Sequence, residues 1–384
     1  MEIQSIRIAS FRAHPDTRID LAPGVNLFYG PNGAGKTNVL EAVHYVCLTK
    51  SFLATQDAYA LRTGSAFFEV EAAFAGRHRS QARARIVYAR GEGKRVFVNS
   101  APLERLSEIV GQFPVVVASP GDYTLTAEGP EIRRRFMDNI LSQSKPVYLD
   151  DLVNYRRALK QRNVLLTRYR RAAMPAGLLD SWDAELVQLG SRVILGRLRF
   201  IRAFTAFLEE AYTQIEAVGE HPRLAYETIG PLDEADTIDA VASCFNDRLA
   251  RAGRREREMG RTLVGPHHDE IVFSLNEMEV RRYASQGQHR LFGLALRLAQ
   301  YFYLKAQLDE EPILLLDDLF GNLDARRSEI VLRLLRDGVV GQSLVTATGR
   351  EPFVHAIPFE DAAHRLFYVE AGRVRQDPHP TAGA

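Results

Sequence analysis

The residues with the clearest chemistry form a glycine-rich loop near the start of the chain. The loop consists of Gly30, Pro31, Asn32, Gly33, Ala34, Gly35, Lys36 and Thr37. It follows an apolar run at 25–29 and precedes a helical pattern of apolar residues at 39–47, which is the strand–loop–helix context of a phosphate-binding loop, or P-loop. Glycines let consecutive backbone N–H groups point at a phosphate, and the helix N-terminus attracts negative charge. A simple glycine-rich turn would leave the Lys36-Thr37 pair unexplained.

An acidic strand end far along the chain fits the same chemistry. The apolar run Ile313–Leu316 is closed by Asp317 and Asp318, which is typical of a central parallel strand with a Walker B end. Lys36 would neutralise the β- and γ-phosphates of ATP, and Thr37 would offer its hydroxyl to Mg²⁺. Asp317 would hold Mg²⁺ through water, and Asp318 would polarise the attacking water as a general base. A buried strand followed by an acidic turn is the alternative, which the P-loop disfavours.

A second anion site is expected at the start of a later helix. Ser285, Gly287 and Gln288 belong to a Ser-Gln-Gly-Gln run that precedes a helical pattern, and Ser285 is placed to cap that helix. A hydroxyl and free N–H groups at a helix start bind anions. Asp324 ends a Gly-Asn-Leu-Asp run that follows the acidic strand end. A Ser-x-Gly-Gln signature, a Walker B strand and a Leu-Asp D-loop in this order resemble the ABC-type ATPases.

The resemblance to ABC-type ATPases implies a nucleotide site shared between two subunits. In these proteins the signature serine reaches the γ-phosphate of ATP held by the other subunit's P-loop, so a head-to-tail homodimer would sandwich two ATP molecules. Ser285 therefore joins Lys36, Asp317 and Asp318 in the predicted catalytic set. Beyond the P-loop, the predicted nucleotide-contacting residues are Arg12, Ser285, Gly287, Gln288 and Asp324.

Composition limits the class of protein. The chain has 384 residues, 46% hydrophobic and 25% charged, which indicates a globular protein of two or three domains. Its formal net charge is only +1, so a nucleic-acid site has to be a local basic patch. Cys47 and Cys244 lie far apart, which favours reduced cytosolic thiols over disulfides or zinc. No apolar run approaches the ~20 residues that span a bilayer, so we expect a cytoplasmic protein without a membrane partner.

The elements that must position these residues form an α/β fold with a helical insertion. Residues 1–122 and 305–384 are predicted to form an ATP-binding lobe, a mixed sheet with helices that carries Walker A, Walker B and the D-loop. The composition shifts after Gly129-Pro130, and residues 123–304 are predicted to form a mostly helical lobe that carries the signature. No heptad pattern persists long enough for a long coiled coil. Residues 376–384, rich in proline and small residues, are predicted to be a disordered tail.

The spacing of the motifs separates two branches of ABC-type ATPases. Ser285 lies 248 residues after Thr37 (285 − 37), whereas a transporter subunit has a shorter chain and places its signature much nearer. The chain is similar to the SMC-like branch, and more closely it resembles the RecF family of bacterial recombination mediators. The blocks that carry this resemblance are Phe11-Arg12, Pro23 to Asn26, Gly30 to Asn38, Glu41-Ala42, Ser119 to Asp122, Gly129-Pro130, Arg133-Arg134, Phe136 to Asp138 and Gly265 to Glu270.

Resemblance to the RecF family implies an ATP-dependent clamp on DNA. It implies a homodimer that binds gapped DNA at single-strand/double-strand junctions, a handover to RecR and RecO, and loading of RecA. Hydrolysis is expected to be weak, DNA-stimulated and slow. Asp318 stands where ABC-type ATPases usually have glutamate, and no histidine follows the strand at 344–348. No glutamine follows the strand at 113–118 either, where Ser119 or Asp122 would take its place.

A basic helical stretch supplies the candidates for DNA contact. Between Arg133 and Arg171 there are eleven Lys/Arg residues against three acids. Clustered arginines bind phosphates without sequence preference. The candidates are Arg133, Arg134, Arg156, Arg157 and Arg162. A solvated helical surface with snorkelling arginines is the alternative.

Two other classes of protein stay open at this point. A transporter ATPase subunit would need an apolar docking surface for membrane helices. An SMC-like chromosome-maintenance ATPase, not dedicated to gap repair, would favour a long coiled coil or a hinge.

Overall fold

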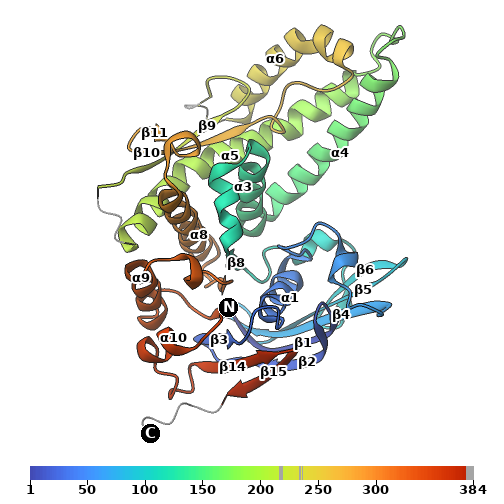
Figure 1. Cartoon of the computed structure of the whole chain (residues 1–384). Coiled ribbons are helices and arrows are strands. Elements are labelled where there is room, and N and C mark those ends of the chain that lie inside the picture. The colour runs from blue at the N-terminus through green and yellow to red at the C-terminus, as the bar shows by residue number, and fades with distance from the viewer. Residues whose placement is uncertain (216–218, 233–234, 236, 378–384) are drawn as a thin grey trace. The chain divides into compact units, whose positions relative to one another are not determined.

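The computed structural model (Figure 1) describes residues 1–215, 219–232, 235 and 237–377. The chain forms two compact units. Unit 1 consists of Met1–Asp122, Glu210–Val218 and Gly293–Ala384, and unit 2 consists of Tyr123–Glu209 and Gly219–Phe292.

The division near the end of unit 2 falls inside helix α8 (Gln286–Leu308), not at residue 305 as the sequence suggested. The second half of α8 is fastened to unit 1. Arg297 pairs with Asp122 at 2.6 Å, and the hydroxyl of Tyr301 accepts a hydrogen bond from the Gly341 N–H at 2.6 Å. The helical periodicity runs without interruption through this point, so the sequence gives no signal for the division.

The central sheet of unit 1 brings the ends of five parallel strands to one edge. Its strand order is β15-β14-β3-β13-β12-β8. The strands are β3 (Val25–Tyr29), β8 (Val115–Ala118), β12 (Ile313–Leu316), β13 (Ser343–Ala347), β14 (Arg365–Glu370) and β15 (Arg373–Asp377). Strands β8, β12, β13, β3 and β14 pair in parallel, and every residue of β8, β12 and β13 is buried. Burial on both faces accounts for their continuous apolar runs.

Strand β15 includes the first two residues of the predicted disordered tail. Gln376 and Asp377 pair with Phe367 and Leu366 of β14. Asp377 also accepts a hydrogen bond from Arg350 at 2.9 Å. The prediction of disorder is therefore wrong for these two residues, because strand pairing satisfies their backbone groups. Residues 378–384 lie outside the described residues.

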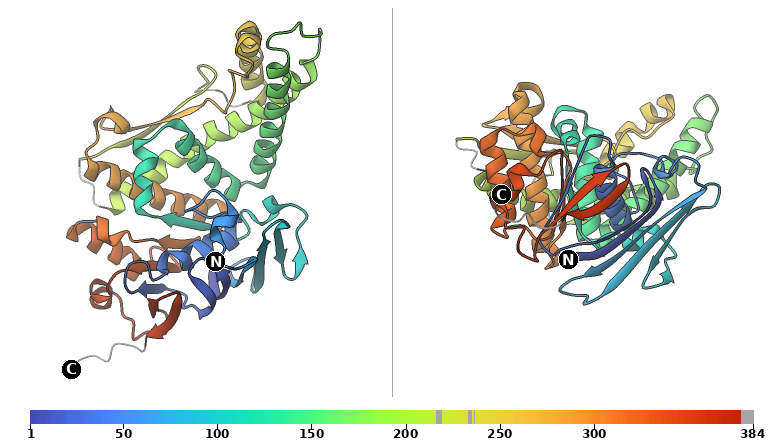
Figure 2. Two further views of the ribbon diagram at one scale, coloured as in Figure 1. Left: turned by 45° about the vertical axis from the view of Figure 1, so that its right-hand side comes forward. Right: turned by 60° about the horizontal axis from the view of Figure 1, so that its bottom comes forward.

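A second, antiparallel sheet in unit 1 covers helix α1 (Lys36–Leu48). Its order is β2-β1-β4-β5-β6-β7. The strands are β1 (Glu2–Phe11), β2 (His14–Asp20), β4 (Phe67–Ala75), β5 (Ala82–Ala89), β6 (Gly93–Val98) and β7 (Ala101–Pro102). Eleven of the thirteen residues of α1 are buried, and α1 shares one apolar core with residues of both sheets. Figures 1 and 2 show α1 lying against the antiparallel sheet. The remaining helices of this part are α9 (Ala325–Arg336) and α10 (Glu351–Ala356).

Unit 2 is mostly helical and carries a small sheet that the sequence analysis missed. Its helices are α2 (Tyr123–Ala127), α3 (Pro130–Ser144), α4 (Pro146–Arg168), most of α5 (Asp180–Gln214), α6 (Ile238–Met259), α7 (Val280–Tyr283) and the start of α8. The sheet is antiparallel, in the order β11 (Met278–Glu279), β10 (Glu270–Leu275), β9 (Pro222–Glu227). A Cβ at Gly190 of α5 would lie 2.5 Å from the Phe245 ring of α6, so glycine permits the close approach of these helices.

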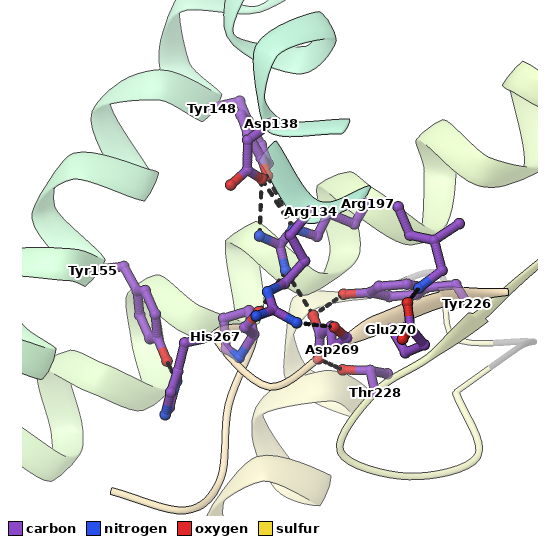
Figure 3. A network of polar contacts seen from close by, with 12 residues as sticks. Arg134, Asp138, Tyr148, Tyr155, Arg197, Tyr226, Thr228, His267, Asp269 and Glu270 are labelled. Atoms are coloured by element: carbon purple, nitrogen blue, oxygen red, sulfur yellow. Dashed lines mark hydrogen bonds and ion pairs between the residues drawn. The ribbon is translucent and has the colours of Figure 1, made fainter. Parts of the chain in front are cut away.

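A buried arginine joins three parts of unit 2 (Figure 3). Arg197 on α5 is 2% exposed. It donates to Asp138 on α3 and to Asp269 beside β10, both at 2.8 Å, and to the carbonyl of Pro266 at 2.6 Å. Burial opposes its charge, but the facing acids and tyrosines more than offset this, and the pKa of Arg197 lies well above its ordinary value. Tyr226 of β9 also donates to Asp269, so the network ties the small sheet to the helices.

Candidate nucleotide-binding site

The glycine-rich loop has the backbone geometry that a P-loop requires. It follows β3 and leads into α1, as the sequence predicts. Gly33 and Gly35 have φ angles of 77° and 103°, which side-chain-bearing residues rarely adopt. At Gly30 a Cβ would lie 2.2 Å from the carbonyl oxygen of Val369, so only glycine fits beside β14. The loop backbone is thus free to turn its N–H groups inward at the start of a buried helix, which is an anion site.

Lys36 places its ammonium group inside the curl of the loop. Its Nζ donates to the carbonyl oxygens of Gly30 at 2.8 Å and Pro31 at 2.9 Å. Burial lowers the pKa of Lys36, while the charges of Asp318 and Asp317 act in the opposite direction. A positive charge at this point would meet the phosphates of a nucleotide held by the loop.

Thr37 and Asp317 meet at the edge of the central sheet. The Thr37 hydroxyl donates to Asp317 Oδ1 at 2.7 Å. Thr346 at the end of β13 donates to the same oxygen at 2.9 Å and accepts from the Asp318 N–H at 2.8 Å. Burial raises the pKa of Asp317, and its bonds from Thr37 and Thr346 partly oppose that shift. The sequence analysis did not single out Thr346, although its place near the end of an apolar run is the signal that would have found it.

The donor set at this edge fits Mg²⁺. A hydroxyl and a carboxylate oxygen are hard ligands of the kind that this ion prefers. Asp318 follows with an exposed side chain and a φ of 46°, a left-handed backbone that is uncommon for residues other than glycine. Strained backbone of this kind is concentrated at functional sites. The turn sends the Asp317 carboxylate toward Thr37 and exposes the Asp318 carboxylate.

Arg12 is held beside α1 by a carboxylate. It lies in the turn between β1 and β2 and makes two hydrogen bonds, of 2.7 and 2.9 Å, to the buried carboxylate of Glu41. His14, which follows the same turn, lies 3.0 Å from the carbonyl oxygen of Gly35 through Nε2. The β1–β2 turn therefore contacts the P-loop, and Glu41 fixes the direction of the Arg12 side chain. Sequence reasoning included Arg12 but assigned no role to Glu41.

The signature residues cap helix α8. Ser285 Oγ accepts a hydrogen bond from the Gln288 N–H at 3.2 Å, and Gln288 Oε1 accepts from the Ser285 N–H at 2.9 Å. This reciprocal pair is a capping box. Ser285 is exposed and Gly287 half-buried. Asp324 caps α9 in a similar way and accepts from the Arg327 N–H at 2.9 Å.

An ion pair lies just after strand β8, where the sequence lacks a Q-loop glutamine. Asp122 accepts from the Ser119 N–H at 2.9 Å and pairs with Arg297 at 2.6 Å. Ser119 itself follows the end of β8 at the same sheet edge as Asp317. Of the two candidates, Asp122 is therefore held by Arg297, whereas Ser119 lies at the sheet edge that carries Asp317.

The five arginines predicted to contact DNA fall into two groups. Arg133 and Arg162 are 4% and 2% exposed and are bound to Glu270 and to Glu256, so their inclusion is corrected. Their basic sequence neighbourhood resembles a surface, but each guanidinium is neutralised by an acid distant in the chain. The other three are more accessible: Arg134 is half-buried, Arg157 is exposed, and Arg156 is 58% exposed although it pairs with Asp138 at 3.1 Å.

Replacing Lys36 by methionine is expected to weaken ATP binding at least about tenfold. The change removes a hydrogen bond to a charged group, which contributes about 1.5–3 kcal/mol, and keeps most of the side-chain volume. Binding of a fluorescent ATP analogue by the purified chain measures this. Lys305→Met, at a lysine that is 42% exposed, is the control. Equal affinity in both variants would show that the Lys36 ammonium does not contact the phosphates.

Comparison with known proteins agrees with this geometry. The family model described as "RecF/RecN/SMC N terminal domain" matches residues 2–374. The chain is 52% identical to the DNA replication and repair protein RecF of Salinibacter ruber, covering 100% of this chain and 94% of that protein. Two solved structures of the recombination mediator protein RecF in the RecFOR pathway, titled RecF-ATPrS and RecF-ATP, superpose with TM-scores of 0.89 and 0.88. Each is 26% identical, and the matches cover 98% of this chain and 98% and 99% of those chains.

Fold and site together define a head of the ABC-type ATPases in their SMC-like branch. The P-loop, the Walker B strand and the capped signature helix are all present, and no long coiled coil occurs in the described ranges. The chain belongs to the RecF family. None of the helices in the described part of the chain is long and apolar enough to cross a bilayer.

Proposed function

We propose that this protein is an ATP-dependent DNA clamp of recombinational repair, which holds gapped DNA as an ATP-sandwiched homodimer. The observation that carries the proposal is the exposed Ser285 at the start of α8, in a chain whose Lys36 lies within the P-loop and whose Thr37 bonds Asp317, as a phosphate and metal site requires. Relatives that carry the name RecF are described as DNA replication and repair proteins and as recombination mediators, and one structure is titled RecF-ATP.

Each site residue has a defined part in binding and hydrolysis. The loop N–H groups and Lys36 would bind the phosphates of ATP, and Thr37 and Asp317 would hold Mg²⁺, which would neutralise charge on the phosphates. Ser285 donates its hydroxyl proton to the γ-phosphate of ATP on the partner subunit, so the dimer is favoured only while that phosphate is present. Asp318 accepts a proton from the attacking water.

Slow turnover is part of the proposal. The Asp318 side chain is one methylene shorter than the glutamate usual at this position, which places the base farther from the water. ATP then acts as a timer for the clamp rather than as fuel for a motor, with weak stimulation by DNA. A turnover comparable to that of transporter subunits, with or without DNA, would contradict this.

Membership of the RecF family supports a DNA partner and protein partners for the proposed clamp. A clamp at single-strand/double-strand junctions beside gaps would hand over to RecR, and through RecO to loading of the RecA recombinase. A RecFOR pathway stands in the titles of the matching RecF structures, which supports a place in that pathway for the present chain. We place the protein in the cytoplasm, where this DNA is.

Molecular mass in solution with gapped duplex DNA, with and without ATP, tests the proposed function. A dimer that holds DNA only when ATP is present is the expected result. A monomer under all conditions, or DNA binding that is independent of ATP, would contradict the clamp. Equal binding to gapped and uninterrupted duplex would favour the alternative, an SMC-like chromosome-maintenance ATPase not dedicated to gap repair.

Charge reversal at Arg156 and Arg157 together is expected to weaken DNA binding about tenfold. Both arginines are exposed on α4, and loss of two phosphate contacts would reduce the salt dependence of log K by about 2. Fluorescence anisotropy over a salt series measures this, with ATP binding as a check on folding. The control reverses Arg83 and Arg85 on β5, which are 65% and 41% exposed. Unchanged DNA affinity would show that the α4 arginines form only a solvated face.

A further inference from the structure

The start of α8 holds the Ser285 hydroxyl in a defined state. Because Ser285 Oγ accepts the Gln288 N–H at 3.2 Å, the hydroxyl proton has to point to a different acceptor. The Ser285 N–H is taken by Gln288 Oε1 at 2.9 Å. The hydroxyl is therefore arranged as a donor toward the solvent side of the helix start, where a phosphoryl oxygen would receive its proton.

This arrangement depends on which end of the Gln288 amide faces Ser285. Gln288 Nε2 donates to Glu220 Oε1 at 3.1 Å. An ionised carboxylate only accepts hydrogen bonds, so Glu220 selects the amide orientation that leaves Oε1 toward the Ser285 N–H. In the opposite orientation two donors would face each other at Ser285, and the capping box would be lost.

Glu220 is itself held in place from both sides along the chain. Asn276, in the turn after β10, accepts from the His221 N–H at 2.8 Å and donates through Nδ2 to the carbonyl of Gly219 at 3.1 Å. Its own N–H donates to the carbonyl of His221 at 3.1 Å. Asn276 has a φ of 49°, a conformation in which asparagine is enriched. The turn therefore fixes the backbone that carries Glu220.

The Glu220 carboxylate is directed to Gln288 specifically. Within the described residues, the buried Oε2 atom of Glu220 has no hydrogen-bond partner. The hydrogen bond to this carboxylate therefore comes from Gln288 Nε2, which donates to Oε1. A surface acid with a purely solubilising role would keep both oxygens in water.

We propose that Glu220 is a positioning residue for the signature motif. It orients the Gln288 amide so that Ser285 presents its hydroxyl proton to the γ-phosphate of ATP on the partner subunit. The part that concerns ATP rests on the proposed function, whereas the orientation of Gln288 and Ser285 is a property of the free chain.

The test compares Glu220→Ala and Glu220→Gln in the full-length protein, by two readouts. Hydrogen exchange of a peptide that spans residues 285–290, without nucleotide, reports the capping box. Single-turnover ATP hydrolysis reports the rate at saturating ATP and the ATP concentration at half-saturation. For Glu220→Ala we expect exchange to rise and the saturated rate to fall, each about tenfold, with unchanged half-saturation, because one hydrogen bond in the chain is lost. We expect Glu220→Gln to keep the exchange and the saturated rate near their wild-type values, because the introduced amide has an oxygen that accepts the hydrogen bond from Gln288. Glu277→Ala, at a 79% exposed acid of the same turn, is the control.

A swap keeps the proposal testable if Glu220→Ala does not fold. Gln288→Glu places two carboxylates side by side and removes the donor to Glu220. We therefore expect its turnover to fall as it does in Glu220→Ala. The double variant Glu220→Gln, Gln288→Glu restores a donor–acceptor pair and is expected to recover most of the rate. Failure of the swap to recover any turnover in a folded protein would overturn the proposal.

Other outcomes separate the inference from the proposed function. Unchanged exchange and turnover in Glu220→Ala would overturn the inference. If the wild type dimerises with ATP, faster exchange with normal turnover in Glu220→Ala would overturn it as well. If the wild type forms no dimer with ATP, the proposed function falls. Hydrogen exchange of residues 285–290 then tests the positioning role alone. Faster exchange in Glu220→Ala but not in Glu220→Gln supports this role, and unchanged exchange in Glu220→Ala overturns it.

Discussion

Replacing Ser285 by arginine is expected to abolish the ATP-dependent dimer while ATP still binds the P-loop. The introduced side chain is too large for the proposed contact between the start of α8 and the partner subunit, and it removes the hydroxyl that would meet the partner's γ-phosphate. Ser285 lies in unit 2, whereas Lys36 and Thr37 lie in unit 1, so the nucleotide pocket itself keeps its residues. Mass in solution with gapped DNA and ATP, beside a nucleotide-binding titration, measures the two effects separately.

Two comparisons support the interpretation of this variant. Ser285→Ala removes the cap at a cost of about 1 kcal/mol and is expected to weaken the dimer without abolishing it. Met278→Arg adds the same cation at a residue of unit 2 that is 56% exposed and should leave the dimer intact. A Ser285→Arg protein that still dimerises with ATP would rule out the contact between subunits at the signature.

Replacing Arg197 by alanine is expected to destabilise the protein by about 3–5 kcal/mol, because two buried carboxylates lose their common partner. Asp138 and Asp269 are 6% and 2% exposed, and neither gains water easily when the guanidinium is removed. Unfolding in urea measures the change. The one tryptophan of the chain, Trp182, lies on the same helix α5, so its fluorescence reports this region.

A matched arginine on α5 serves as the control for Arg197. Arg192 is 42% exposed and pairs with Asp151 at 3.3 Å, and surface pairs of this kind contribute about 0–1 kcal/mol. Arg192→Ala should therefore shift the urea midpoint only slightly. If the two variants lose similar stability, the buried network does not hold unit 2 together as described.

The sequence predicted the phosphate site because its signals are local. The glycine loop, the apolar strand before it and the Asp317-Asp318 pair each lie within a few residues, and parallel strand pairing then brings them to one edge. Ser285 was identified as a cap by the same kind of local pattern. Thr346 and Glu41 were missed because their importance comes from Asp317 and Arg12, which are 29 residues away in each case.

The wrong predictions also arise from partners that lie far away in the chain. Arg162 belongs to a basic stretch that resembles a surface, yet its guanidinium is buried against Glu256, 94 residues later in the chain. Arg133 is paired with Glu270, 137 residues away. Such partners follow from tertiary packing, and neither composition nor periodicity contains them. Strand β9 was missed because β-propensity depends on the neighbouring strand, and its partner β10 begins more than forty residues later.

The burial of α1 has a consequence for the thermodynamics of nucleotide binding. With eleven of thirteen residues buried between two sheets, this helix cannot order further when ATP arrives. A binding site that is already ordered avoids the entropy cost of ordering, which weakens binding to mobile loops. Calorimetry on the isolated chain should therefore record a small heat-capacity change when ATP enters the P-loop. The larger negative change, the marker of apolar burial, should appear at protein concentrations at which two chains associate.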